Sequence, residues 1–245
     1  MRTDQRGRLS VSLADLQALV YPGDLAGALH TICARYGVSH MTFLVVRIAN
    51  GPLASPYYCS TYPTDWIRTY LANDYFTIDP VIDVARWGLL PVDWSTLDQR
   101  SVQAERLFDE AAANGIGPNG LTIPVRGANG ERCLFSVTSD LPEKDWSALR
   151  GSALHDLHIL SYYLHEQVLE ISGLRQPALL RSLSGRERQC LQLLGSGKIY
   201  KQIAATLGIS ESAVRLYVRK ARRKLSATTS YHAVAKASYL ELIDV

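Results

Sequence analysis

The C-terminal segment, from residue 183 to residue 245, is divided by helix caps and glycines in an order that few folds accommodate. Ser184 followed by Glu187 has the form of a capping box ahead of an apolar stripe. Gly208 ends a second stripe, and Ser210 stands where a third helix would be capped. This order predicts a helix-turn-helix with four short helices, one from Ser184 to the glycines at 195–197, one over 199–207, one capped by Ser210 and one over 230–242, capped by Ser230.

The third of these helices has a basic outer face. Its apolar positions recur at three- and four-residue spacing and must face the core: Val214, Val218, Ala221 and Leu225. The outer side is left with Ser212, Arg215, Arg219, Arg222 and Arg223. Arg215 and Arg219 lie one turn apart, where both can reach guanine in a major groove, and Ser212 can meet a phosphate. A solvated face is the commoner meaning of such a stripe, but the absence of acid after Glu211 favours DNA binding.

The net charge of +3 conceals a division along the chain, which has 26 Lys and Arg against 23 Asp and Glu. Residues 1–176 hold 14 basic and 19 acidic side chains, whereas residues 177–245 hold 12 basic and 4 acidic ones. Such a basic segment favours a polyanionic partner, because each phosphate that meets Lys or Arg releases condensed counterions. A solubilising tail would have the same charge, so the helical pattern decides for double-stranded DNA.

The longer N-terminal part alternates helical and strand patterns. Apolar spacing predicts helices over 12–20, 24–36 with Asp24 as cap, 64–73, 102–113 and 147–171, and a short one beginning at Asp79-Pro80. Runs of β-branched and aromatic residues predict two hairpins, with strands over 41–49 and 57–62 around Asn50-Gly51 and over 121–126 and 132–138 around residues 128–130. The fold class is therefore α+β: an N-terminal α-β-α sandwich with an antiparallel sheet, plus a C-terminal four-helix helix-turn-helix domain.

The sequence GLRQP at residues 173–177 is the best candidate for a domain boundary. We expect a first domain over 1–172, a linker over 173–182 and a helix-turn-helix domain over 183–245. Strong enzyme motifs are absent, and the four cysteines lie far apart, so they are expected to be buried thiols rather than disulfides or zinc ligands. Neither a signal peptide nor a membrane span is apparent, which predicts a cytoplasmic protein with no membrane partner.

The C-terminal segment resembles the helix-turn-helix of the LuxR family of transcription regulators. The resemblance rests on Glu187, Leu191, Gly197, Ile203, Ala204, Leu207, Val214, Lys224 and Leu225. The chain departs from the family pattern at Gly185, where proline is usual, at Ala213, where threonine is usual, and at Tyr217, where histidine is frequent. The change at 213 puts one phosphate contact in doubt and leaves Arg215 and Arg219 untouched.

The N-terminal part carries four short motifs in order: Tyr62-x3-Trp66-x3-Tyr70, Asp79-Pro80, Trp94-Ser95 and Gly120-x-Thr122-x-Pro124. They resemble the autoinducer-binding domain of the acyl-homoserine-lactone receptors, so the two resemblances cover nearly the whole chain. Together they imply a quorum-sensing transcription regulator that is not an enzyme. Its implied partners are an N-acyl-homoserine lactone, a second copy of the chain in a homodimer, a two-fold symmetric promoter site and, as a further option, RNA polymerase.

The resemblance also implies roles for six pocket residues. Trp66 would donate its indole N–H to the lactone carbonyl, and Asp79 would accept from the amide N–H. These residue types suit the roles, because an indole only donates and an ionised carboxylate only accepts. The other implied roles are Tyr62 and Ser136 as donors to the amide carbonyl, Trp94 as a wall of the lactone ring and Tyr70 as lining of the acyl channel.

Two other interpretations stay open at this point. Each residue taken singly is more typical of packing or capping, and the same polar frame would suit a solo receptor for a non-lactone metabolite. The shape of the pocket, and with it the acyl group, would depend on residues such as Val45, Tyr75 and Phe76.

A lactone-hydrolysing enzyme is the third interpretation. It would need a nucleophile or metal with an activating base, but His155, His158 and His165 are spaced like a solvated face of the long helix rather than a metal site. No metal and no cofactor are therefore expected beside the small-molecule ligand.

Overall fold

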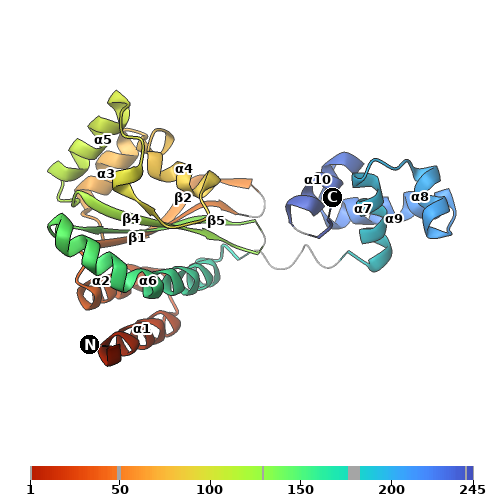
Figure 1. Ribbon diagram of the computed structural model, residues 1–245. Helices are drawn as coiled ribbons and strands as arrows, with labels where there is room; N and C mark the ends of the chain where they lie inside the picture. Colours follow the sequence, from red (N-terminus) through yellow and green to blue (C-terminus); the bar gives the residue numbers. More distant parts are fainter. Residues whose placement is uncertain (1, 49–50, 129, 176–182, 241, 245) are drawn as a thin grey trace. The chain divides into compact units, whose positions relative to one another are not determined.

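The structure is a computed structural model that describes residues 2–48, 51–128, 130–175, 183–240 and 242–244, without the side chains of residues 2–6 and 51–55. The chain divides into two compact units (Figure 1), one of residues 1–127 with 131–175 and one of residues 128–130 with 176–245. Each unit is described by itself. The predicted linker over 173–182 falls mostly outside the described residues, and its bounds remain a prediction.

A five-stranded antiparallel sheet forms the middle of the first unit. Its strands are β1 (His40–Ile48), β2 (Gly51–Ser60), β3 (Val92–Asp93), β4 (Asn119–Arg126) and β5 (Arg132–Ser139). They are hydrogen-bonded in the order β2-β1-β5-β4-β3, and every neighbouring pair is antiparallel. Both predicted hairpins are present, but β2 spans Gly51–Ser60 rather than 57–62, and residues 50 and 129 of the predicted turns lie outside the described residues. The short edge strand β3 was not predicted.

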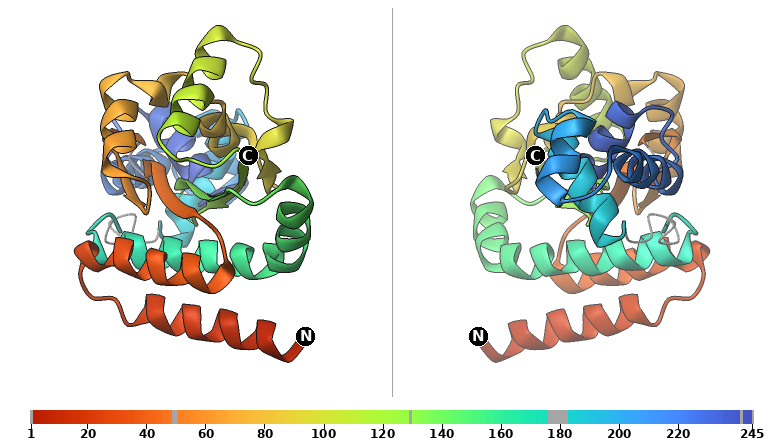
Figure 2. Two further views of the ribbon diagram at one scale, coloured as in Figure 1. Left: turned by 90° about the vertical axis from the view of Figure 1, so that its left-hand side faces the viewer. Right: turned by 90° about the vertical axis from the view of Figure 1, so that its right-hand side faces the viewer.

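Helices cover both faces of this sheet (Figures 1 and 2). On one face lie α1 (Arg2–Gln17), the 3-10 turn η1 (Pro22–Asp24), α2 (Leu25–Tyr36) and α6 (Glu143–Ile171), with α1 outermost and packed on α2 and α6. The other face carries α3 (Thr64–Ala72), the turn η2 (Tyr75–Thr77), α4 (Pro80–Trp87), the turn η3 (Trp94–Thr96) and α5 (Val102–Ala113). The predicted α-β-α sandwich is confirmed.

Successive strand residues alternate between two separate cores, because neighbouring side chains of a strand point to opposite faces. Phe43 and Phe135 are fully buried in the core beneath α2 and α6. Leu44 and Leu134, their neighbours in sequence, belong to the core beneath α3, α4 and α5. The pocket described in the next subsection lies in this second core.

The second unit consists of α7 (Gly185–Gly195), α8 (Tyr200–Leu207), α9 (Glu211–Lys224) and α10 (Ser230–Tyr239). Ser184 and Glu187 form the predicted capping box, and Ser210 caps α9 by accepting from the amide of Ala213. Gly208 ends α8 at φ 65°, a left-handed conformation that favours glycine. The apolar positions predicted for the third helix are all buried: Val214, Val218, Ala221 and Leu225.

Several predicted boundaries were wrong. Helix α1 begins at Arg2 rather than at residue 12, and α6 begins at Glu143 rather than at 147. Residues 2–8 and 143–145 have no apolar side chain, so no apolar period marks the start of either helix. The carboxylate of Asp24 makes no capping bond, since a 3-10 turn precedes α2. The cap of α10 is Thr229, which accepts from the amide of His232, rather than Ser230. Adjacent hydroxyl residues have similar capping preferences, so sequence does not choose between them.

Candidate functional site

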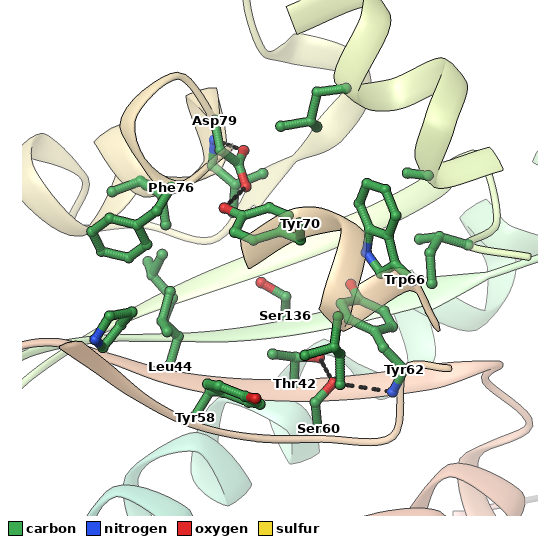
Figure 3. A pocket seen from close by; sticks show the side chains of 18 of the residues that line it. Thr42, Leu44, Tyr58, Ser60, Tyr62, Trp66, Tyr70, Phe76, Asp79 and Ser136 are labelled. Atoms are coloured by element: carbon green, nitrogen blue, oxygen red, sulfur yellow. Dashed lines mark hydrogen bonds between the residues drawn. The ribbon is translucent and has the colours of Figure 1, made fainter. Parts of the chain in front are cut away.

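A pocket of about 120 Å³ lies between the sheet and helices α3, α4 and α5. All six residues predicted to bind ligand line it: Tyr62, Trp66, Tyr70, Asp79, Trp94 and Ser136. They come from the end of β2, from α3, from the start of α4, from η3 and from β5, so the fold brings distant parts of the chain to one cavity (Figure 3). The remaining lining is largely apolar, including Leu44, Ile67, Leu71, Phe76, Val81, Ile82, Leu107, Phe108 and Leu134.

Asp79 is held through both carboxylate oxygens. Its Oδ1 accepts from the amide of Val81 at 2.8 Å and caps α4, and its Oδ2 accepts from the Tyr70 hydroxyl at 2.8 Å (Figure 3). Burial raises the pKa of Asp79 to about 6, although both hydrogen bonds oppose that shift. Because each carboxylate oxygen has two lone pairs, Oδ2 can still accept from a ligand N–H.

Trp66 and Tyr62 form the polar end of the pocket, next to one another (Figure 3). Trp66 is 4% exposed and packs edge-on against Tyr70, with ring centroids 5.9 Å apart. Within the described residues its indole N–H has no hydrogen-bond partner, so this donor is available to a ligand. Burial, and secondarily the charge of Asp79, raise the pKa of Tyr62, so its hydroxyl stays protonated and can also donate.

Trp94 is fixed by a short chain of hydrogen bonds. Its indole Nε1–H donates to Thr122 Oγ1 at 2.8 Å, and Thr122 Oγ1 lies 2.9 Å from Ser136 Oγ. Gly120 allows this placement, because a Cβ atom there would overlap the indole ring. The motif glycine and threonine therefore act on the pocket through Trp94 and Ser136 rather than by lining it.

The sequence-based prediction of the pocket was incomplete. It missed Thr42 and Ser60, whose hydroxyl oxygens are 2.6 Å apart on the pocket floor (Figure 3). Strand alternation would have indicated them once the register with Ser136 was known. Phe76 lines the pocket as expected, whereas Val45 points into the opposite core and was wrongly assigned. Tyr75 lies in the pocket-side core but not among the lining residues.

The second candidate surface is the outer side of α9. Ser212, Arg215, Arg219 and Arg223 are exposed there, as predicted. Arg222 differs, because it is half-buried and its guanidinium donates to the carbonyl of Thr228, so it is turned toward the following loop. The basic face is thus carried by three of the four predicted arginines.

Arg215 is held in place by two neighbours that sequence analysis did not single out. Its Nη2 donates to Glu211 Oε1 at 2.6 Å, one helical turn earlier. Its guanidinium also lies over the ring of Tyr200 at the start of α8, 5.1 Å from the ring centroid. Such stacking limits the freedom of a long side chain. The contact joins two different helices, which is why helical spacing alone did not predict it.

The described part of the chain has neither a metal-binding cluster nor a membrane-spanning helix. It contains no group of three or more His, Cys, Asp or Glu placed to hold a metal ion, and none of its helices is long and apolar enough to cross a membrane. All four cysteines are buried free thiols, as predicted. The expectation of a solvated histidine face on α6 was wrong for His165, which is buried and whose pKa is lowered by that burial.

Known proteins resemble both units. Residues 22–168 match the family described as autoinducer binding domain, and residues 181–237 match the bacterial regulatory proteins of the luxR family. The transcriptional activator protein RaiR of Rhizobium etli is 45% identical over 183 residues, which cover 75% of this chain and 76% of RaiR. CarR of Pectobacterium carotovorum subsp. carotovorum, also a transcriptional activator protein, is 27% identical over 215 residues, or 84% of this chain and 88% of CarR.

Solved structures share the fold. A crystal structure of Escherichia coli SdiA superposes with a TM-score of 0.69 at 19% identity, covering 97% of this chain and 98% of SdiA. SdiA in complex with octanoyl-rac-glycerol gives the same TM-score at 21% identity, covering 97% of this chain and 96% of that one. The chain therefore has the same two-part architecture, and its named relatives are regulators of transcription rather than enzymes.

Proposed function

The chain belongs to the LuxR family, in which an autoinducer-binding domain is joined to a helix-turn-helix DNA-binding domain, and from this premise we propose a specific signal and target. It is a ligand-responsive transcription regulator of the quorum-sensing type, and its ligand is a small molecule rather than a cofactor. We propose that this molecule is an N-acyl-homoserine lactone, and that a homodimer of the chain binds a two-fold symmetric promoter site.

The pocket supports the lactone proposal because its polar groups match those of the molecule. An acyl-homoserine lactone offers one amide N–H, two carbonyl groups and an apolar chain. The pocket offers one carboxylate acceptor in Asp79, donor groups in Trp66 and Tyr62, and an apolar lining. A buried ligand requires such pairing, since an unpaired polar group in a dry cavity costs free energy. This correspondence is the observation that carries the proposal.

The DNA proposal is supported by the position of the exposed arginines. Arg215 and Arg219 lie one turn apart on the helix that follows the turn. The ion pair with Glu211 and the ring of Tyr200 hold the guanidinium of Arg215 in place. A dimer would place two copies of α9 in successive major grooves about one DNA turn apart. Ser212 near the start of α9 and Arg223 near its end would then lie at the phosphates.

Replacing one donor tests the ligand. Trp66→Phe keeps an aromatic ring but removes the indole N–H, so we expect N-acyl-homoserine lactones to bind about tenfold more weakly or worse. The measurement is the rise in unfolding midpoint of the full chain when it is titrated with the lactones. The matched control is Trp87→Phe, because Trp87 is 82% exposed and does not line the pocket.

Equal lactone responses of Trp66→Phe and the wild type would contradict this role for Trp66. Mass spectrometry of the small molecule that co-purifies with the full chain separates the two receptor classes. An intact lactone would support the proposal, and a non-lactone metabolite would instead favour the solo receptor.

A further inference from the structure

Four hydroxyl side chains form a row across the pocket face of the sheet. The strand register pairs Ser60 with Thr42, Thr42 with Ser136 and Ser136 with Thr122, so the row crosses β2, β1, β5 and β4 in turn. Adjacent strands are about 4.8 Å apart, which sets the spacing of the row. The hydroxyls form two bonded pairs, Thr42 with Ser60 at 2.6 Å and Thr122 with Ser136 at 2.9 Å. Figure 3 shows Ser136, Thr42 and Ser60 in this order.

The pair of Thr122 and Ser136 leaves one hydroxyl proton that can be donated into the pocket. The indole of Trp94 can only donate, so Thr122 Oγ1 accepts its bond. The hydroxyl proton of Thr122 then goes to Ser136 Oγ, its remaining partner. All three groups are satisfied in this direction, and the O–H of Ser136 is left to donate to a ligand.

The pair of Thr42 and Ser60 leaves another such proton. The backbone N–H of Tyr62 donates to Ser60 Oγ at 3.0 Å, and the bond between Ser60 and Thr42 uses one of their two hydroxyl protons. The Tyr62 hydroxyl interacts with the Thr42 side chain and can itself donate onward, so the three hydroxyls of Ser60, Thr42 and Tyr62 together keep a proton for a ligand. The pocket floor therefore offers two donor hydroxyls on adjacent strands, although an unsubstituted acyl amide brings only one carbonyl to this place.

The row marks the border between the polar and apolar ends of the pocket. Tyr62 and Trp66 lie on one side of it (Figure 3). On the other side, the next inward-facing residues of β1, β2 and β5 are Leu44, Tyr58 and Leu134. A molecule with its lactone at Trp66 and its chain along Leu44 would cross the row with the amide carbonyl and the first carbons of the acyl group.

We infer that the acyl chain of the ligand carries an oxygen on its third carbon, as a keto or hydroxyl group, and that the Thr42–Ser60 pair donates to it. This inference rests on the proposed lactone ligand. The Ser136 hydroxyl serves the amide carbonyl, and the second donor lies beside it on the neighbouring strand, where the first carbons of the acyl group cross the row. An unsubstituted chain at that place would cover a buried O–H without giving it an acceptor, which weakens binding.

The test compares homoserine lactones of equal chain length that are unsubstituted, 3-oxo or 3-hydroxy, each titrated into the full chain. We expect the wild type to bind at least one oxygenated lactone about tenfold more tightly than the unsubstituted one. The double variant Thr42→Val with Ser60→Ala removes both hydroxyls at nearly constant shape and should bind all three alike. Ser136→Ala is the matched control, and should weaken all three by a similar factor.

A wild type that binds the unsubstituted lactone as tightly as both oxygenated ones would overturn the inference while leaving the proposed function intact. So would a double variant that is folded and keeps the wild-type preference. If the double variant does not fold, the wild-type ratio decides alone. Failure of the wild type to bind any of the three at several chain lengths would instead refute the lactone proposal itself.

Discussion

Asp79 caps α4 and is also predicted to bind the ligand, two roles that the sequence left as alternatives. An aspartate before proline is typical of a helix cap, and the family resemblance assigns the same residue to the ligand. The two are compatible because the carboxylate has two oxygens, of which Oδ1 caps α4 and Oδ2 faces Tyr70 and the pocket. We therefore expect any change at this position to act on α4 as well as on ligand binding.

The raised pKa of Asp79 predicts a pH dependence of binding. Only the ionised carboxylate accepts freely from an amide N–H, so lactone affinity should fall as the pH drops through about 6, approaching tenfold per pH unit below it. In the ligand-free protein the sign is opposite. Because the folded pKa exceeds the unfolded one, the contribution of Asp79 to stability is present below pH ~4 and is lost as the pH rises through about 6.

Titration calorimetry between pH 5 and 8 measures this dependence, with Asp79→Asn as the comparison. The variant should bind more weakly at neutral pH and lack the fall below about 6. An identical fall in both proteins would assign the titration to another group.

Tyr200 is predicted to prepare Arg215 for DNA. Removing the ring with Tyr200→Leu should cost about 0.5–1 kcal/mol of specific affinity, whereas Tyr200→Phe keeps the ring under the guanidinium and should cost less. Arg215→Ala should cost about 1–3 kcal/mol if it reads a base. The measurement is affinity for sites selected from random-sequence DNA, which should be two-fold symmetric.

A double variant gives the control for this prediction. Tyr200→Leu should have no further effect once Arg215 is alanine, because the ring then has nothing to hold. Full additivity of the two losses, or equal effects of the leucine and phenylalanine variants, would show that Tyr200 acts independently of Arg215.

Pocket residues could be predicted from the sequence where they belong to short motifs. Tyr62, Trp66 and Tyr70 follow helical spacing, and Asp79 and Trp94 stand in short motifs, so their meeting in one pocket was anticipated. Thr42, Ser60 and Tyr200 were missed because their contacts depend on strand register or on the crossing of two helices. The ligand and DNA roles of the predicted residues stay predictions.

At the level of elements, the close approach of β4 to η3 yields a test of pocket construction. Gly120→Ala would place a methyl group against the Trp94 indole, so we expect a loss of about 1–3 kcal/mol in the free energy of unfolding and weaker lactone binding. The control is Gly151→Ala within α6, where a Cβ meets nothing within 4 Å. That change should instead stabilise by up to about 1 kcal/mol, because alanine favours helices.

Urea unfolding measures both glycine variants, and near-ultraviolet circular dichroism reports the environment of Trp94. Gly120→Ala with wild-type stability and an unchanged tryptophan signal would mean that the contact relaxes freely.

Elements whose two ends are marked by capping or helix-ending residues were the most predictable. Helix α5 has the predicted bounds, Val102–Ala113, because Ser101 caps it and Asn114 ends it. Strand β3 has only two residues and no period to detect, and it was missed. Helices α1 and α6 begin with residues that have no apolar side chain, so their starts were placed too late.

For the whole molecule, the division of charge found in the sequence coincides with the division of folded structure. The acidic part of the chain forms the unit with the pocket, and the basic part forms the unit with α9. A ligand that binds only the folded first unit stabilises it by mass action, by about 2.7 kcal/mol at a hundred times its Kd. We propose that this stabilisation couples signal to DNA binding.

The two-sided strands of the central sheet also bear on how such receptors diverge. Thr42, Leu44 and Ser136 contact the pocket, while Phe43 and Phe135 between them belong to the opposite core. Substitutions at every second position can therefore alter the signal that a lineage recognises without disturbing the scaffold beneath. Ligand specificity can therefore change during evolution while the intervening residues preserve the fold of the sheet.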